Sequence, residues 1–136
     1  MHKRVAVLSK AALVLALCSV SLAPAAPALA DETIAKGSFV GQSGHVAKGG
    51  VSVRKTSSGI VVVLAPDFSF DGAPDPKLGF GKNGYDASTQ FSALRSNSGE
   101  QSYEIPASVD PGDYNEVWVW CEKYAVPLGV ATLKAE

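Results

Sequence analysis

The chain has 136 residues, of which 46% are hydrophobic and 18% are charged, and its formal net charge at pH 7 is −1. A chain of this length and composition is large enough for one small domain with a single core. Because the net charge is not positive, nucleic acid or an anionic membrane surface is not expected as a partner, since both attract strongly basic proteins.

Residues 1–30 have the composition of a cleaved secretory signal peptide. Basic residues, the last of them Lys10, precede an apolar stretch over 11–22, and Ala28-Leu29-Ala30 forms a small-x-small cleavage site. We therefore expect an exported protein, secreted, periplasmic or held in the cell envelope. Its mature domain is expected to cover residues 31–136, with no membrane span after cleavage.

Two alternatives compete with cleavage after Ala30. Lipidation would use Cys18, but Leu17 is larger than the small residue that normally precedes a lipidated cysteine. An uncleaved anchor would use the apolar run over 11–22, which is short for a span of the bilayer. Both alternatives are weaker than the cleaved signal peptide.

The mature chain has an acidic balance and a single thiol. The signal segment holds three basic and no acidic residues, so residues 31–136 keep nine basic and 13 acidic residues, a net charge of −4. Cys18 leaves with the signal, so Cys121 has no partner for an internal disulfide in an oxidising compartment.

The first half of the mature chain predicts short strands joined by glycine-rich turns. After a polar lead-in over 31–36, the small and apolar residues of 37–50 predict a first hairpin. Val51-Ser52-Val53-Arg54 alternates like a half-exposed strand, and the turn at Ser57-Ser58-Gly59 leads into a strand over 60–64 that is apolar on both faces.

The middle of the chain is rich in Asp, Gly and Pro. Residues 66–84 predict a structured connection around one short strand near Leu78 and Phe80. Residues 86–96 are compatible with a short helix capped by Asp86 or with a strand. Residues 101–105 alternate again, which predicts a strand that Pro106 ends.

The organising stretch is residues 116–121, which are almost all β-branched or aromatic and predict a strand buried in the middle of a sheet. With a period of two, Val117, Val119 and Cys121 share one face, and Trp118 and Trp120 share the other. After a break at 122–124, a further strand follows over 126–133. About seven to eight short strands and no strong amphipathic helix predict an all-β domain, an antiparallel β-sandwich or a closely related barrel.

A set of short motifs resembles a known family. In chain order they are Gly37-x-Phe39, Gly44-His45 with Gly49 or Gly50, Asp67-Phe68, Ala73-Pro74-Asp75, Leu94, Gly99-x-Gln101-x-Tyr103-x-Ile105-Pro106, Tyr114, Val117 to Cys121, and Ala131-x-Leu133. This series resembles the DM-thirteen domain, or electron-transfer DM domain, which accompanies DOMON modules in Skeletor-like and cytochrome-b-type proteins. The resemblance covers essentially the whole mature chain, and it implies a β-sandwich with a redox role for Cys121, as a bare thiol or as a ligand to a prosthetic group such as haem.

Cys121 has two interpretations. A redox thiol or ligand needs access and a stabilised thiolate, which the charge of nearby Lys123 would assist. Because Cys121 ends its strand just before polar residues, we expect it near the rim and partly accessible. The alternative is a small apolar core residue, since free cysteine is among the most buried side chains.

The ligand inventory limits the cofactors. His45 lies in a glycine-rich hairpin, where it could ligate haem or a metal, form a local hydrogen bond or face solvent. The mature chain has one His, one Cys and no Met, so one chain cannot build a copper or zinc site, and a c-type haem motif is absent. The cofactor is thus unknown, and haem b held by Cys121, with or without His45, fits the residues.

Other polar and aromatic residues have simpler explanations. The residues Asp67, Asp71 and Asp75 are typical of turns, and their spacing matches no EF-hand. Trp118 and Trp120 either line a ligand surface or pack. No phosphate loop, nucleophile elbow or pair of catalytic carboxylates is present, so a turnover enzyme is not expected.

Two functions follow from this sequence. The first is a small exported domain with a redox or electron-transfer role centred on Cys121, acting with an unknown redox partner or envelope protein. The second is a non-catalytic envelope or extracellular binding module in which the cysteine is structural. In both, the domain is expected to be a monomer.

Overall fold

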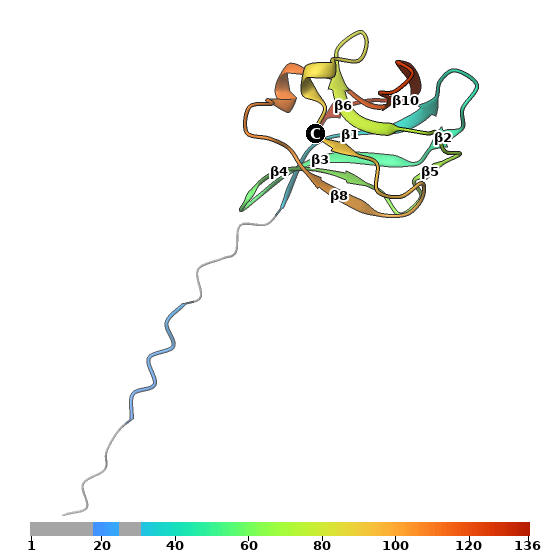
Figure 1. Cartoon of the computed structure of the whole chain (residues 1–136). Coiled ribbons are helices and arrows are strands. Elements are labelled where there is room, and N and C mark those ends of the chain that lie inside the picture. The colour runs from blue at the N-terminus through green and yellow to red at the C-terminus, as the bar shows by residue number, and fades with distance from the viewer. Residues whose placement is uncertain (1–17, 25–30) are drawn as a thin grey trace, which may run out of the picture.

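The computed structural model describes residues 18–24 and 31–136 (Figure 1). Most of the expected signal peptide, including its cleavage site, lies outside these residues. Within them no helix is long and apolar enough to cross a bilayer. The only helical segments there are two 3₁₀ turns, η1 (Ala87–Thr89) and η2 (Pro111–Asp113).

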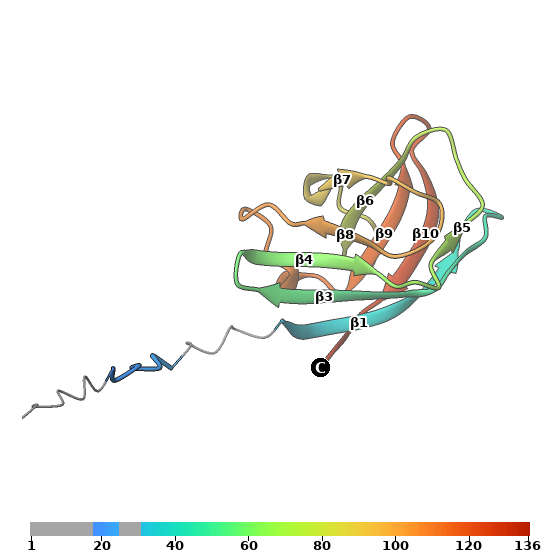
Figure 2. The ribbon, with the colours of Figure 1, turned by 90° about the horizontal axis from the view of Figure 1, so that it is seen from below.

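Residues 32–135 form a nearly closed antiparallel barrel. Its strands follow one path, β7-β6-β9-β10-β1-β3-β4-β8, while β11 pairs with β1, and β2 and β5 form a separate ribbon. The strands are β1 (Glu32–Gly41), β2 (Ala47–Lys48), β3 (Gly50–Thr56), β4 (Gly59–Leu64), β5 (Ser69–Phe70), β6 (Pro76–Gly81), β7 (Ser92–Ala93), β8 (Gln101–Glu104), β9 (Glu116–Cys121), β10 (Val126–Thr132) and β11 (Lys134–Ala135). Figure 2 shows β1, β3 and β4 forming one side of the barrel, with β6, β9 and β10 on the other. The predicted all-β fold is confirmed, in its barrel form.

Strand β9 lies in the middle of its side of the barrel, as its sequence predicts. It pairs along its whole length with β6, from Pro76↔Cys121 to Gly81↔Glu116, and with β10, from Val126↔Cys121 to Thr132↔Glu116. Its inward residues Val117 and Val119 are fully buried, whereas Trp118 and Trp120 are half-buried on the outer face. The predicted division of the strand into two faces is thus confirmed, with the inner face in the core and the outer face half-buried.

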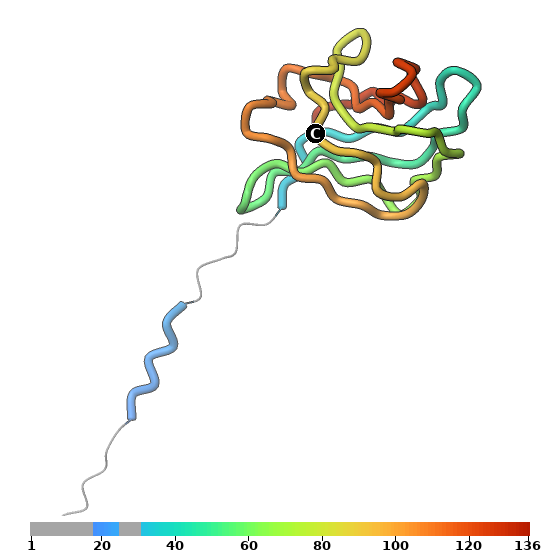
Figure 3. Tube along the Cα trace, in the orientation of Figure 1, coloured from blue at the N-terminus to red at the C-terminus, as the bar shows by residue number. Residues whose placement is uncertain are grey.

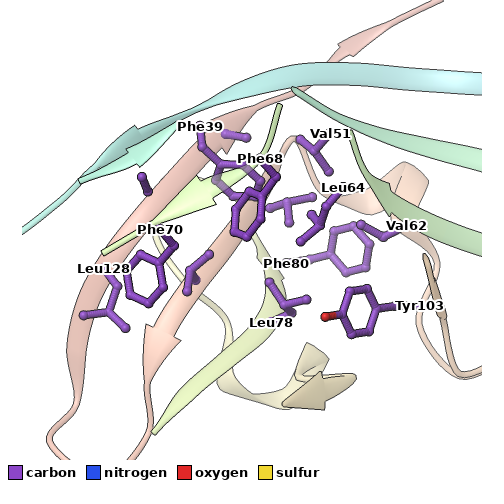
Figure 4. Packing of buried hydrophobic residues seen from close by; sticks show 14 of the residues in the cluster. Phe39, Val51, Val62, Leu64, Phe68, Phe70, Leu78, Phe80, Tyr103 and Leu128 are labelled. Atoms are coloured by element: carbon purple, nitrogen blue, oxygen red, sulfur yellow. The ribbon is translucent and has the colours of Figure 1, made fainter. Parts of the chain in front are cut away.

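The core fills the barrel with inward side chains from nearly every strand (Figure 4). Its largest fully buried members are Phe68, Phe80, Leu64, Leu78 and Leu128. Burial of each such side chain contributes roughly 1.5–3 kcal/mol, so these positions dominate the stability of the fold.

Two local predictions need correction. The predicted lead-in is part of β1, because residues from Glu32 onward pair with β3 and residues Ala35 and Lys36 also pair with β11. The short strand predicted near Leu78 is the six-residue β6, whose pairing with β9 makes it a core strand.

The uncertain segment 86–96 contains both predicted kinds of structure. Asp86 caps η1 by accepting a hydrogen bond from the Ser88 amide, and β7 follows on the edge of the sheet. The tube in Figure 3 traces this excursion out of β6 and back to the barrel.

Candidate functional site

Cys121 is the last residue of β9, and its side chain points into the barrel beside those of Val117 and Val119. It is 2% exposed, and its cross-strand neighbours are Pro76 on β6 and Val126 on β10. The expectation that Cys121 is partly accessible is wrong for this structure. Both neighbouring strands run as far as β9 does, so the end of the strand is not an open rim.

His45 lies between β1 and β2, at the same end of the barrel. Its Nδ1 is 3.0 Å from Oδ1 of Asp71, and its ring centre is 5.9 Å from that of Phe70. Hydrogen bonds from the backbone of Val46 and from the His45 imidazole hold the pKa of the Asp71 carboxyl below its usual value. Of its three predicted roles, the structure shows the local hydrogen bond.

The segment Asp71–Asp75, here called the end loop, joins β5 to β6 (Figure 2). It begins at the partner of His45 and ends immediately before Pro76, the residue opposite Cys121. In the described residues no hydrogen bond or ring contact joins His45 to Cys121. The structure therefore brings the two residues to one end of the barrel without forming a shared ligand set.

Asp75 is a site residue whose role the sequence did not reveal. Its backbone oxygen accepts a hydrogen bond from the Glu122 amide at 3.2 Å, and its Oδ2 accepts one from the Lys123 amide at 3.0 Å. Its Oδ1 lies 3.3 Å from Nζ of Lys77. These contacts tie the end loop to the β9–β10 turn directly after Cys121. The sequence signal was the Asp75-Pro76 pair, which marks the start of a strand but does not identify what the carboxylate binds.

Lys123 contacts the ring of its neighbour Tyr124. Its ammonium nitrogen lies 5.3 Å from the centre of the Tyr124 ring, in a cation–π arrangement on the surface. Its backbone amide, in the turn directly after Cys121, donates a hydrogen bond to Asp75.

Haem at Cys121 does not fit the packing described. A thiolate ligand must expose its sulfur to an iron that is carried by a broad planar ring. Cys121 instead belongs to the buried core cluster, and it lines none of five depressions on the surface of the barrel. Residues 18–24 and 31–136 also contain no group of three His, Cys, Asp or Glu side chains able to hold a metal ion.

The predicted turn aspartates lie in different contacts. Asp67 accepts a hydrogen bond from the Gly50 amide at 2.9 Å, Asp71 contacts His45, and Asp75 contacts the β9–β10 turn. Each carboxylate stabilises a loop, as the turn interpretation predicts.

The outer face of β9, opposite to the face that carries Cys121, forms an aromatic group that the sequence predicted only in part. Trp120 stacks on Tyr85 with ring centres 4.6 Å apart, and Trp118 meets Trp120 edge-on at 6.5 Å. Trp118 also donates its indole N–H to Glu116 at 2.8 Å. Both tryptophans therefore pack, and no ligand is needed to explain them.

Glycines on β6 make room for this aromatic group. A Cβ on Gly79 would lie 2.7 Å from Cε2 of Tyr85, and one on Gly81 would lie 2.6 Å from Nε1 of Trp118. Tyr85 is the partner that sequence reasoning missed, because it comes from a separate loop.

Comparison with known proteins identifies the family. Residues 38–133 match the family described as Electron transfer DM13. The chain belongs to the DM13 family. No curated protein and no solved structure matches it. The DM13 match begins within β1, runs to the end of β10 and includes both His45 and Cys121, so the resemblance seen in the sequence is confirmed.

Proposed function

We propose that this DM13 domain is an exported redox module in which Cys121 is the reactive group, as a bare thiol. The observation that carries the proposal is the position of Cys121. It is the single sulfur of residues 31–136, and it ends the central strand directly before an exposed turn. A short local opening of that turn would expose the thiol without unfolding the barrel.

The chemistry of this proposal is thiol–disulfide exchange with a disulfide of a partner protein or a small molecule. The Cys121 thiolate attacks one sulfur of the partner disulfide, a new S–S bond forms, and the other partner sulfur leaves as a thiolate. A thiolate of a second molecule then attacks the partner sulfur of the mixed disulfide, which forms a new disulfide and releases the Cys121 thiolate. The second molecule's thiol is thereby oxidised to a disulfide, while the sulfur that left the first disulfide is reduced to a thiol. The two electrons remain in sulfur chemistry, so no further oxidant is required.

A binding module is the second candidate, and the 2% exposure of Cys121 favours it. A wholly buried thiol in apolar surroundings is inert and contributes only packing. In that case the partner would bind elsewhere on the barrel, and the residue would serve as a core side chain beside Val119.

Thiol exchange with glutathione disulfide separates the two candidates. The purified domain 31–136 is incubated with the disulfide under native conditions, and intact mass measures the mixed disulfide at Cys121. Cys121→Ser is the matched control. The redox proposal expects a mixed disulfide in native protein, formed faster than global unfolding allows. Modification that occurs only at the rate of global unfolding would support the binding module.

Export is proposed on the composition of residues 1–30 alone. Cleavage after Ala30 predicts a product whose N-terminal residue is Asp31. Intact mass of the secreted or periplasmic protein tests this, and a lipid-modified Cys18 in the product would contradict it.

A further inference from the structure

The end loop crosses the end of the barrel at which Cys121 is buried. It leaves β5, reaches the tip of the β9–β10 hairpin and enters β6 (Figure 2). Within it Ala73 packs against the core cluster, and Gly72 has a positive φ of 96° that lets the chain turn back toward the barrel. The loop is thus a cover with one side on the core and the other in solvent.

The cover is attached at its first residue to the β1–β2 connection. The Asp71 amide donates to the Val46 carbonyl at 3.0 Å, and the Asp71 carboxylate meets His45 at 3.0 Å. These contacts hold the start of the loop whether or not the far end is released.

Asp75 is the last residue of the end loop. Within the part of the chain that the structure describes, it makes all the hydrogen bonds between this loop and the β9–β10 hairpin. All three Asp75 oxygens have partners: Glu122, Lys123 and Lys77. The carboxylate bonds lie at the surface, so they are less costly to break than the ladder of β9. Release of Asp75 would free both the turn that follows Cys121 and the loop that precedes Pro76.

We infer that Asp75 is a latch residue, which holds the end loop and the β9–β10 turn closed over Cys121 and so sets how often the thiol is exposed. The biological use of this latch rests on the proposed redox function, but the latch itself does not. Asp75 acts by holding the end loop in place, and its role requires no contact with the reacting sulfur of Cys121.

Asp110 supplies a matched control. Its Oδ1 accepts a hydrogen bond from the Gly112 amide at 2.9 Å, and its backbone oxygen accepts one from the Asp113 amide at 3.1 Å. Like Asp75 it uses one carboxylate oxygen and its backbone oxygen, but it caps its own turn at the start of η2, before the opposite end of β9.

The test is the rate at which a maleimide labels Cys121 in the domain 31–136. Rates are measured for wild type and for the variants Asp75→Ala, Asp75→Asn and Asp110→Ala, at several denaturant concentrations below the unfolding transition. Loss of hydrogen bonds to a charged group predicts labelling about tenfold faster in Asp75→Ala. Asp75→Asn keeps an acceptor for the Lys123 amide and should lie between that variant and wild type, and Asp110→Ala should label like wild type.

The dependence on denaturant separates a latch from a general loss of stability. Local opening exposes little surface, so the faster rate should change little with denaturant, whereas global unfolding gives a steep rise. The inference is overturned if Asp75→Ala labels at the wild-type rate, or if its rate follows global unfolding. If Asp75→Ala labels quickly with maleimide but forms no mixed disulfide with glutathione disulfide, the latch stands and the redox function fails.

Discussion

The rings of Tyr85 and Trp120 stack 4.6 Å apart with an angle of 16° between their planes, although the residues come from a loop and a strand that are 35 positions apart. The stack lies over β6, where the absence of a side chain at Gly79 leaves space for the tyrosine ring. It half-buries the phenol next to two acidic side chains. This arrangement has a measurable electrostatic consequence.

Burial, followed by the charges of Glu122 and Asp86, raises the pKa of Tyr85 to about 12 from 10.0. The folded state therefore favours the neutral phenol more than the unfolded state does. This contribution to stability is fully present below pH 10 and is lost as the pH rises from 10 to 12. We expect the absorbance at 295 nm to show a late tyrosinate component that is missing in Tyr85→Phe.

Tyr124→Phe is the control for that titration, because Tyr124 is 58% exposed and lies outside the stack. It should keep the late component. Burial and Asp86 also raise the pKa of Tyr114, so the component is assigned to Tyr85 from the difference between wild type and Tyr85→Phe. An unchanged late component in Tyr85→Phe would contradict the assignment.

Gly81→Ala should destabilise the barrel through the same face of β6. The new methyl group would overlap the carbonyl oxygen of Gly84 and lie 2.6 Å from Nε1 of Trp118, so backbone must move. Overpacking of this kind costs about 1–3 kcal/mol. Urea denaturation followed by tryptophan fluorescence measures it.

Gly112→Ala is the matched glycine control. The atom nearest to the added Cβ would be Oδ1 of Asp110 at 3.1 Å, which is the end of a flexible side chain that can shift. A loss of stability in Gly112→Ala equal to that in Gly81→Ala would show that the cost arises from removing glycine as such.

Phe80→Ala should be among the most destabilising single substitutions. Phe80 is 0% exposed, and its ring packs against Phe91 at 5.4 Å and Tyr114 at 5.9 Å. Truncation of a buried aromatic ring costs about 3–5 kcal/mol. Val40→Ala, at a position that is 62% exposed, should change the free energy of unfolding by less than about 0.5 kcal/mol. Thermal or urea unfolding of both variants checks the contrast.

The strands could be predicted from the sequence wherever alternation and β-branching are local properties. The inward face of β9 and the turn between β3 and β4 follow directly from such patterns, and both are confirmed. The sequence does not decide between sandwich and barrel, because the barrel depends on β1 pairing with both β3 and β10, and the paired residues Phe39 and Ala131 lie 92 positions apart.

For a similar reason, the sequence does not decide between the accessible and the core position of Cys121. The polar residues after it correctly indicate the end of a strand, but the cover over that end comes from residues 71–75, and Asp75 reaches Lys123 across 48 positions. The local alternation of residues predicts which face of its strand a side chain occupies. Whether the end of the strand is open to solvent depends on tertiary packing. His45 illustrates the same limit, since its partner Asp71 is 26 positions away.

Thr89 is the one fully buried polar side chain in the part of the chain that the structure describes, at 1% exposure. Its hydroxyl oxygen accepts a hydrogen bond from the Phe80 amide at 2.7 Å. The same hydroxyl lies 2.7 Å from the Asp86 carbonyl and 3.0 Å from the Phe80 carbonyl, and it donates its single proton to one of them. Thr89 thereby joins η1 to the core strand β6.

Thr89→Val keeps the shape of this side chain and removes its hydroxyl. The Phe80 amide would then be buried without an acceptor, which costs about 1–3 kcal/mol. Thr89→Ser retains the hydroxyl and loses only a methyl group, so it should cost about 1 kcal/mol, near the value of one buried methylene. Urea unfolding of both variants gives the comparison, with amide exchange at Phe80 as a local readout. We expect exchange at Phe80 to accelerate in Thr89→Val and to remain slow in Thr89→Ser. If Thr89→Val is as stable as wild type and Phe80 stays protected, then the hydroxyl is not what holds η1 on β6, and packing alone must attach it.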